Sequence, residues 1–240
     1  MVADTSEVTG IQDIVDSKEI LGESEIKGGW YKDENNDIKW TECKNSKEWS
    51  ASKIEGDFLG SAVVNINGSL NETLGTKQKG DTGYDGRHTN GYIDGKDAIT
   101  AEVMVYGPHG ENDVKTYIGF TMSSNSEKFG VVANGIYSVN RLSENERKGP
   151  YESDLVVESR SARIPALNNY NPAYPDRSPG YLTGVFLHRC NRSGWMGTFY
   201  ENGKIKGVSE GCLIIDPSHW HSFCEQISSV NSFKLILSRS

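Results

Sequence analysis

The chain has 240 residues, a formal net charge of −8 and a pI near 5.2, and it is long enough for one large domain or two small ones. It has no block rich in Lys and Arg, so the electrostatic term that drives most nucleic-acid binding has no source and we expect no nucleic-acid partner. No apolar run approaches membrane-spanning length, so we expect no membrane insertion. The polar, acidic N-terminus, Met1–Glu7, does not resemble a secretory signal peptide.

The first part of the chain, residues 1–95, is expected to be a β-rich linker or module. A short helix is predicted over residues 13–21. Two short runs containing Trp30 and Trp40 flank the turn-rich segment Asp33–Asp37, which predicts a β-hairpin with the two indoles paired across it. Further along, one strand is predicted over residues 57–66, and the Gly- and Asn-rich residues 69–97 are expected to form an ordered, loop-like junction.

The second part, residues 96–240, is expected to be a second β-rich domain. Between residues 160 and 180 lie four prolines, which exclude a helix or a central strand and favour a long loop that covers the site. A helix is predicted to begin at Asp216. Its apolar face is formed by Trp220, Phe223, Cys224 and Ile227. Strands are predicted at Ile99–Tyr106, Tyr117–Met122, Val131–Val132, Gly135–Val139, Tyr181–Leu187, Leu213–Ile215 and Phe233–Leu237. The sequence therefore predicts a mainly β protein with a few short helices.

His188 and Cys212 form a candidate catalytic pair. His188 ends the apolar run Tyr181–Leu187, and Cys212 follows Gly211 at the mouth of a second predicted strand. The loop between them is long enough for the two strands to be neighbours, which would bring the imidazole and the thiol together. A thiol attacks as its thiolate, and an adjacent imidazole that accepts the proton is its usual activator. The pair therefore predicts Cys212 as nucleophile and His188 as general base.

Two further groups complete the predicted site. The carbonyl or hydroxyl of Ser209 is expected to orient the His188 ring. The backbone N–H groups of Gly211 and Cys212 are expected to face the oxyanion that forms when the thiol attacks a carbonyl. Gly211 suits a sharp turn before the nucleophile, since the turn demands backbone freedom that a side chain would obstruct.

These residues resemble the signature of the L,D-transpeptidase family. In that family a His, a loop and then Ser/Thr-His-Gly-Cys correspond to His188 and the segment Ser209–Cys212, and residues 134–139 resemble the Thr-Pro-x-Gly-x-Tyr/Phe strand. The likeness covers about residues 99–233 and implies that residues 96–240 form an L,D-transpeptidase-like catalytic domain. The resemblance implies a β-sandwich or barrel that needs no cofactor. It also implies that the Cys attacks the stem peptides of peptidoglycan, in a reaction of the L,D-transpeptidase or L,D-carboxypeptidase type.

The sequence also departs from that family's pattern. Glu210 stands where the family has His, and Arg189 stands where Gly commonly follows the first His. The Arg or Asn that follows the Cys in the family, and helps to hold the substrate carboxylate, is missing. We expect Arg189 or Arg192 to take over that role, and the resemblance implies Tyr137 as a further substrate-binding residue.

A second resemblance concerns the first part of the chain. The segments Gly29–Asp33, Ile38–Thr41 and Phe58–Gly60 are similar to the linker ahead of C-terminal toxin domains in RHS-type polymorphic toxins of Bacteroidetes. It implies an antibacterial effector that a dedicated secretion system, commonly type VI, delivers without a signal peptide. The site of action would be the periplasm or cell wall of a target bacterium, and an immunity protein would be a partner.

Other interpretations of the same residues stay open. The main alternative is a non-catalytic module that binds cell wall or glycan, in which Cys212 is structural. The pair Trp30 and Trp40 is more typical of hairpin packing than of a sugar platform.

Metal or disulfide chemistry at the same residues is less favoured. A zinc site from His188, Cys190 and Cys212 has suitable ligand types but lacks Cys-x-x-Cys spacing, and we expect no metal. The four cysteines do not have the spacing of a disulfide scaffold, so a Cys190–Cys212 disulfide is not favoured either. His219 and His221 are two apart on a predicted helix and therefore point to different faces.

Overall fold

The computed structural model describes residues 26–84, 86, 91–123, 129–167, 180–190, 199–201, 204–206 and 209–240. The prediction of a mainly β protein with a few short helices is confirmed. The predicted helix over residues 13–21 lies outside the described residues, and so does most of the Pro-rich segment. Among the described residues, no helix is long and apolar enough to cross a membrane.

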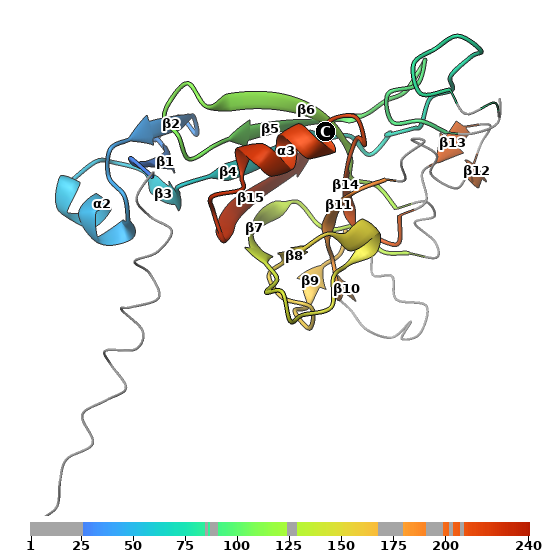
Figure 1. The fold of residues 1–240 in the computed structure, drawn as a ribbon. Helices are drawn as coiled ribbons and strands as arrows, with labels where there is room; N and C mark the ends of the chain where they lie inside the picture. Colours follow the sequence, from blue (N-terminus) through green and yellow to red (C-terminus); the bar gives the residue numbers. More distant parts are fainter. Residues whose placement is uncertain are drawn as a thin grey trace, which may run out of the picture.

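Eight strands form one strongly curved sheet, in the order β11-β14-β6-β5-β4-β15-β7-β8 (Figure 1). Most neighbours are antiparallel, but β4 pairs with β15 and β11 pairs with β14 in parallel. A bridge between Val156 and Phe186 brings β8 beside β11, so the sheet is nearly closed into a barrel. The strands are β4 (Val63–Gly68), β5 (Ala101–Tyr106), β6 (Val114–Phe120), β7 (Gly135–Arg141), β8 (Leu155–Val157), β11 (Leu187–Arg189), β14 (Leu213–Ile215) and β15 (Ser232–Arg239).

Alternation along these strands builds the main core. In β5, Val103 and Val105 are buried while Glu102 is exposed, as expected where successive side chains point to opposite faces. The inward residues of all eight strands belong to one apolar cluster, which also contains Phe223 and Ile227 of α3 (Trp220–Gln226). Gln226 joins the helix to the sheet, because its amide donates to the backbone oxygens of Val105 and Asp113.

A smaller sheet packs against the outer face of the large one. Its order is β2-β1-β3, and Trp30 pairs with Trp40, which confirms the predicted hairpin. The Trp30 indole is 2% exposed, lies edge-on to Trp40 and Tyr106, and donates from Nε1 to the carbonyl of Gly107 at 2.8 Å. Trp30 therefore joins the small sheet to the large one. The elements are β1 (Gly29–Lys32), β2 (Ile38–Thr41), α2 (Ser46–Ser52) and β3 (Asp57–Gly60).

The strand predicted over residues 57–66 is in fact two strands in different sheets. The chain turns at Gly60, where φ is +113°, so β3 stays with the hairpin and β4 enters the large sheet between β5 and β15. The large sheet thus extends across the predicted domain boundary between residues 95 and 96. The junction over residues 69–97 also buries more than expected, since Leu74, Tyr92 and Ile93 are core residues.

Two other predicted elements differ in extent. The run Tyr181–Leu187 is broken at Gly184, where φ is +64°, so that β10 (Tyr181–Leu182) pairs with β9 (Ile164–Pro165) and His188 lies in the middle of β11. The last helix begins at Trp220 rather than Asp216, because the Asp216 carboxylate accepts from Ser218 and forms a turn first. The remaining elements are η1 (Pro150–Glu152), β12 (Phe199–Glu201) and β13 (Lys204–Lys206).

A buried polar cluster fastens the end of the C-terminal strand. The Glu72 carboxylate accepts from the N–H and the hydroxyl of Thr121, and Arg239 donates to the Thr121 hydroxyl and carbonyl. Arg239 also donates to the carbonyl of Val132. Burial raises the pKa of Glu72, while the positive charge of Arg239 acts in the opposite direction. The cluster ties β15, the end of β6 and the 69–73 turn together.

We predict that Trp30→Phe lowers the free energy of unfolding by about 1–3 kcal/mol, because it leaves the buried Gly107 carbonyl without its donor. The matched control is Trp40→Phe, since the Trp40 indole donates to an exposed Glu42 carboxylate. Its effect should be below about 1 kcal/mol. Urea denaturation of both variants measures the difference, and equal losses would contradict the anchoring role of Trp30.

Candidate functional site

The parallel pairing of β11 with β14 places His188, which is on β11, near Cys212, which directly precedes β14. His188 is in register with Ile214, and Leu187 is in register with Leu213. Leu187 and Leu213 point into the barrel, so His188 and the residues that alternate with Leu213 point outward. Cys212 directly precedes Leu213 and packs against Phe186, which shares the outward face with His188, so His188 and Cys212 lie on the same side of the β11–β14 pair.

The His188 ring is held in one tautomer by its own strand. Its Nδ1 lies 2.6 Å from the carbonyl oxygen of Arg189, and because a carbonyl only accepts, Nδ1 carries the proton. Nε2 of the neutral ring then has a free lone pair. Burial lowers the pKa of His188, and this effect outweighs the hydrogen bond to the Arg189 carbonyl, which raises it. The charge of Arg189 also lowers the pKa, so the neutral ring dominates at pH 7.

Cys212 lies just before β14 and is half-buried. Its Sγ accepts from the backbone N–H of Phe186 at 3.5 Å and packs against a small cluster of Leu142, Val156 and Phe186. Burial raises the pKa of the Cys212 thiol, and the nearby charge of Glu210 adds to the effect. The side chain is therefore a protonated thiol at neutral pH.

The turn before Cys212 has the conformation that its glycine predicts. Gly211 has a φ of +115°, and a Cβ there would lie 2.9 Å from Leu182. Ser209 holds this turn closed, because its Oγ donates to the Cys212 carbonyl at 2.8 Å and accepts from the Gly211 N–H at 3.1 Å. Ser209 was expected to orient the His188 ring, but the hydrogen-bond partner of His188 Nδ1 is the Arg189 carbonyl. The Gly211 N–H was expected to face an oxyanion, but it donates to Ser209 Oγ.

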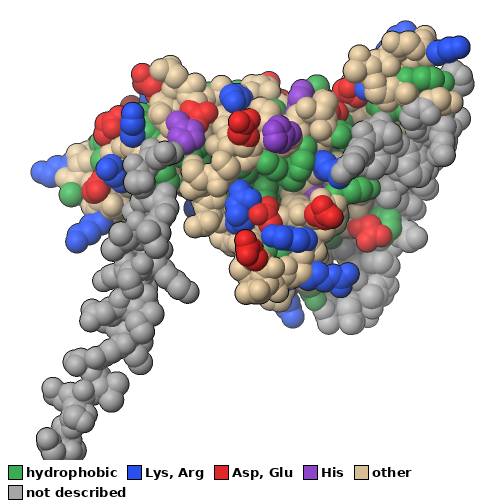
Figure 2. Space-filling view, viewed as in Figure 1, with side chains coloured by type: hydrophobic (Ala, Val, Ile, Leu, Met, Phe, Trp, Pro, Cys, Tyr) green, Lys and Arg blue, Asp and Glu red, His purple; other side chains and the backbone are tan. Residues whose placement is uncertain are grey.

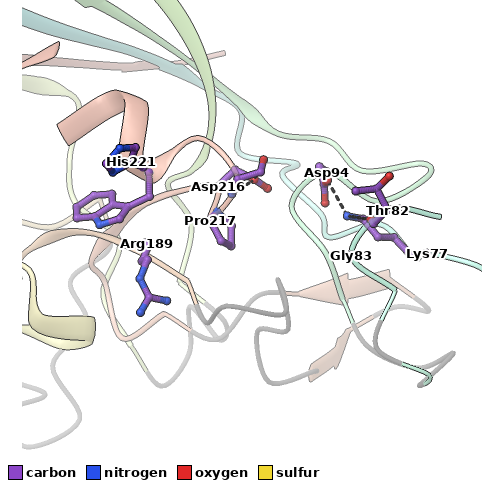
Figure 3. A pocket seen from close by; sticks show the side chains of 10 residues that line it. Lys77, Thr82, Gly83, Asp94, Arg189, Asp216, Pro217 and His221 are labelled. Atoms are coloured by element: carbon purple, nitrogen blue, oxygen red, sulfur yellow. Dashed lines mark hydrogen bonds and ion pairs between the residues drawn. The ribbon is translucent and has the colours of Figure 1, made fainter. Parts of the chain in front are cut away.

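Arg189 lines a cleft of about 340 Å³ beside the site (Figure 3). Across the cleft, Lys77 forms an ion pair with Asp94 at 2.7 Å, and the near wall includes Asp216 and His221. Arg189 donates to the carbonyl of Cys190 at 2.9 Å. Charged side chains of both signs line the cleft, and Arg189 is the predicted substrate-binding residue that borders it.

Of the other two predicted substrate-binding residues, the structure describes only Tyr137, and it does not pack with Cys212. Tyr137 lies on β7 in the main core, and its hydroxyl donates to the carbonyl of Ala133 at 2.8 Å. Because that core fills the inside of the barrel, Tyr137 faces away from the surface that carries Cys212. Its role in the described structure is packing, and not the substrate binding that the resemblance implied. Arg192 lies outside the described residues.

Tyr151 is a neighbour of the site that the sequence interpretation missed. Its ring lies 5.8 Å from the His188 ring, and the Arg189 guanidinium lies 5.1 Å from its centre. Tyr151 and Glu152 both have positive φ, at 51° and 62°, which is costly for residues with side chains. The signal in the sequence that could have indicated a turn at Tyr151 is the preceding Gly149-Pro150 pair.

Metal and disulfide alternatives find no support in the described part of the chain. No three His, Cys, Asp or Glu side chains come together there as ligands, and all four cysteines are free thiols. Cys190 packs in a different cluster, with Phe120 and Ile214. His219 accepts from the N–H of Ile118 through Nδ1, so its role is structural.

Comparisons with known proteins identify no relative. No protein-family model, no curated protein and no solved structure matches this chain. Figure 2 shows acidic and basic side chains intermixed over the face that it displays, without a large patch of one sign. The functional argument therefore depends on the geometry of the site.

We predict that Cys212 reacts slowly with iodoacetamide at pH 7 and faster as the pH rises. The reason is that burial holds the Cys212 pKa above its ordinary value, so the thiolate fraction at pH 7 is below that of a free thiol. Below the pKa the rate should rise about tenfold per pH unit. Mass-spectrometric mapping of labelled Cys212 between pH 6 and 10 measures this. Fast labelling that is independent of pH would instead indicate a preformed thiolate–imidazolium pair.

We predict that Gly211→Ala destabilises the protein by at least about 1 kcal/mol, since Ala is strained at this φ and its Cβ would press on Leu182 and on the Gly130 carbonyl. The matched control is Gly80→Ala, where φ is +107° but no atom lies within 4 Å of the added Cβ. Thermal unfolding compares the two. An equal loss at both positions would show that only the backbone conformation matters.

Proposed function

We propose that this chain is a cysteine-dependent enzyme of the L,D-transpeptidase or L,D-carboxypeptidase type that acts on the stem peptides of peptidoglycan. The observation that carries the proposal is the position of Cys212 at the start of β14 beside the parallel strand β11 that carries His188, with the His188 tautomer set by the Arg189 carbonyl. An imidazole fixed in this way presents Nε2 as a base toward its surroundings.

In the proposed reaction, Cys212 Sγ attacks the carbonyl carbon of a peptide bond in the stem peptide. His188 Nε2 accepts the thiol proton and returns it to the leaving amine as the C–N bond breaks, which leaves a thioester on Cys212. Water or an acceptor amine then attacks the thioester, and the thiol is regenerated. Because the Gly211 N–H bonds Ser209, the Cys212 N–H is the donor assigned to the oxyanion.

A protonated thiol and a neutral imidazole suit this sequence of steps. The pKa of Cys212 is raised and that of His188 is lowered, so no ion pair needs to exist before substrate binds. Proton transfer then accompanies attack. Arg189, which lines the neighbouring cleft, is the proposed contact for a substrate carboxylate.

The biological setting remains part of the proposal. The resemblance of the first part of the chain to RHS-type linkers supports an antibacterial effector that is delivered to the cell wall of a rival and is neutralised by an immunity protein. Toxicity on periplasmic expression, abolished by Cys212→Ala, is the expected result.

We predict that Cys212→Ala and His188→Ala each abolish turnover of muropeptides while the protein stays folded. Mass analysis of muropeptides incubated with each protein reports both the bond attacked and the acceptor. The control is Cys224→Ala, because Cys224 is on α3, packs against the core, and burial raises its pKa to about 11. Full activity of either site variant would rule out the mechanism.

The raised pKa and apolar packing of Cys212 favour a second candidate, a non-catalytic module that binds cell wall or glycan. In that case Cys212 is a small core residue. This candidate predicts saturable binding to purified peptidoglycan that alkylation of Cys212 leaves unchanged, with no change in muropeptide mass.

A further inference from the structure

A second cleft lies against the Cys212 cluster on the outer face of the barrel. Its volume is about 440 Å³, and its walls include Leu142 and Val156, the two residues that pack with Phe186 against Cys212. A group bound in this cleft would therefore be separated from the thiol by one layer of side chains.

Arg160 lines this cleft and carries an unsatisfied donor. Its Nη2 is buried and has no hydrogen-bond partner in the described structure. The guanidinium lies 5.0 Å from the centre of the Phe186 ring, and the backbone N–H of Phe186 is the group that donates to Cys212 Sγ. Gly149 packs directly against the Phe186 ring, since a Cβ at position 149 would lie 2.4 Å from that ring. Phe186 thus couples the position of Arg160 to that of Cys212.

The other arginine that lines the cleft is already paired. Arg141 forms an ion pair with Asp154 at 2.6 Å and donates to the carbonyl of Ile227. A buried donor on a charged group that stays unsatisfied is costly, so Arg160 is the position at which an anionic ligand would gain most.

Two carboxylates also line the cleft, so a simple anion does not match its charge. Glu146 accepts the N–H and hydroxyl of Ser143 through Oε2, and Glu158 accepts the N–H of Ser138 through Oε1. Each carboxylate has a second oxygen with acceptor capacity. Glu158 has a φ of 55°, a costly conformation for a residue with a side chain.

We infer that this cleft binds an amino-acid group that carries both a free carboxylate and a free ammonium. Arg160 binds the carboxylate through its guanidinium, and Glu158, with Glu146 at the rim, accepts from the ammonium. This assignment deepens the proposed function and rests on it in one respect, namely that the bound group is a zwitterionic end of the stem peptide whose reacting bond lies at Cys212.

The test uses the full chain and free D-alanine as probe, with binding measured by calorimetry or saturation-transfer NMR. D-alanine should bind saturably, whereas N-acetyl-D-alanine and D-alanine amide, which each keep one charge, should bind more weakly. Arg160→Gln should weaken D-alanine binding about 10- to 100-fold, the range of a lost charged hydrogen bond. Glu158→Gln keeps an oxygen for Ser138 and should weaken binding through the lost charge.

Arg163→Gln is the matched control. Arg163 stacks on the Tyr181 ring at 4.8 Å in the same region but does not line the cleft, so binding should be unchanged. Arg160→Lys is a folding control for Arg160→Gln, because it keeps the positive charge at position 160 but loses the planar stack on Phe186. Absence of saturable D-alanine binding, equal binding of N-acetyl-D-alanine, or wild-type affinity in Arg160→Gln would each overturn the inference.

The two proposals fail separately. Binding of D-alanine through Arg160 does not require the thiol, so it should persist in Cys212→Ala. If it persists while muropeptides are never turned over, the subsite stands and the enzyme proposal falls. If turnover depends on Cys212 and D-alanine does not bind, the enzyme proposal stands and the subsite falls.

Discussion

The pairing of the C-terminal strand β15 with both β4 and β7 is the constraint on which the large sheet depends. β15 runs parallel to β4 and antiparallel to β7, so it joins the β4-β5-β6-β14-β11 side of the sheet to the β7-β8 side. Pairing between strands so distant in sequence closes long loops, which costs conformational entropy. Burial of the apolar inward face of β15, formed by Phe233, Leu235 and Leu237, offsets this cost. The Glu72–Thr121–Arg239 cluster then fixes the end of β15.

Curvature of this sheet produces the candidate site. Once β8 and β11 meet at the Val156–Phe186 bridge, the inward face is filled by apolar side chains, and polar chemistry is confined to the outer face and the rim. His188 and Cys212 share that outer face under partial cover, which explains the lowered pKa of the imidazole and the raised pKa of the thiol. The same bridge brings Arg160 to Phe186, and through Phe186 to Cys212.

Local patterns were sufficient for several elements. The hairpin around Asp33–Asp37, the apolar face of α3 and the left-handed turn at Gly211 all follow from residues close together in the chain. Patterns were insufficient where glycine interrupts an apolar run. Neither Gly60 nor Gly184 was expected to divide a strand, because an apolar run looks the same whether it belongs to one sheet or to two. The predicted domain boundary at residue 95 was placed at the Gly- and Asn-rich junction, which lies downstream of β4, a strand of the large sheet.

The sequence by itself determined the mainly β class, the candidate nucleophile and base, and the glycine turn that precedes the nucleophile, because each depends on residue type and short spacing. Only the tertiary structure decided which face each residue occupies. It turned Tyr137 into the core and made the Arg189 carbonyl the partner of His188. It also brought Arg160, Glu146 and Glu158 around one cleft. These outcomes depend on strand order and barrel closure, and such long-range pairings leave no periodic signal in a single sequence.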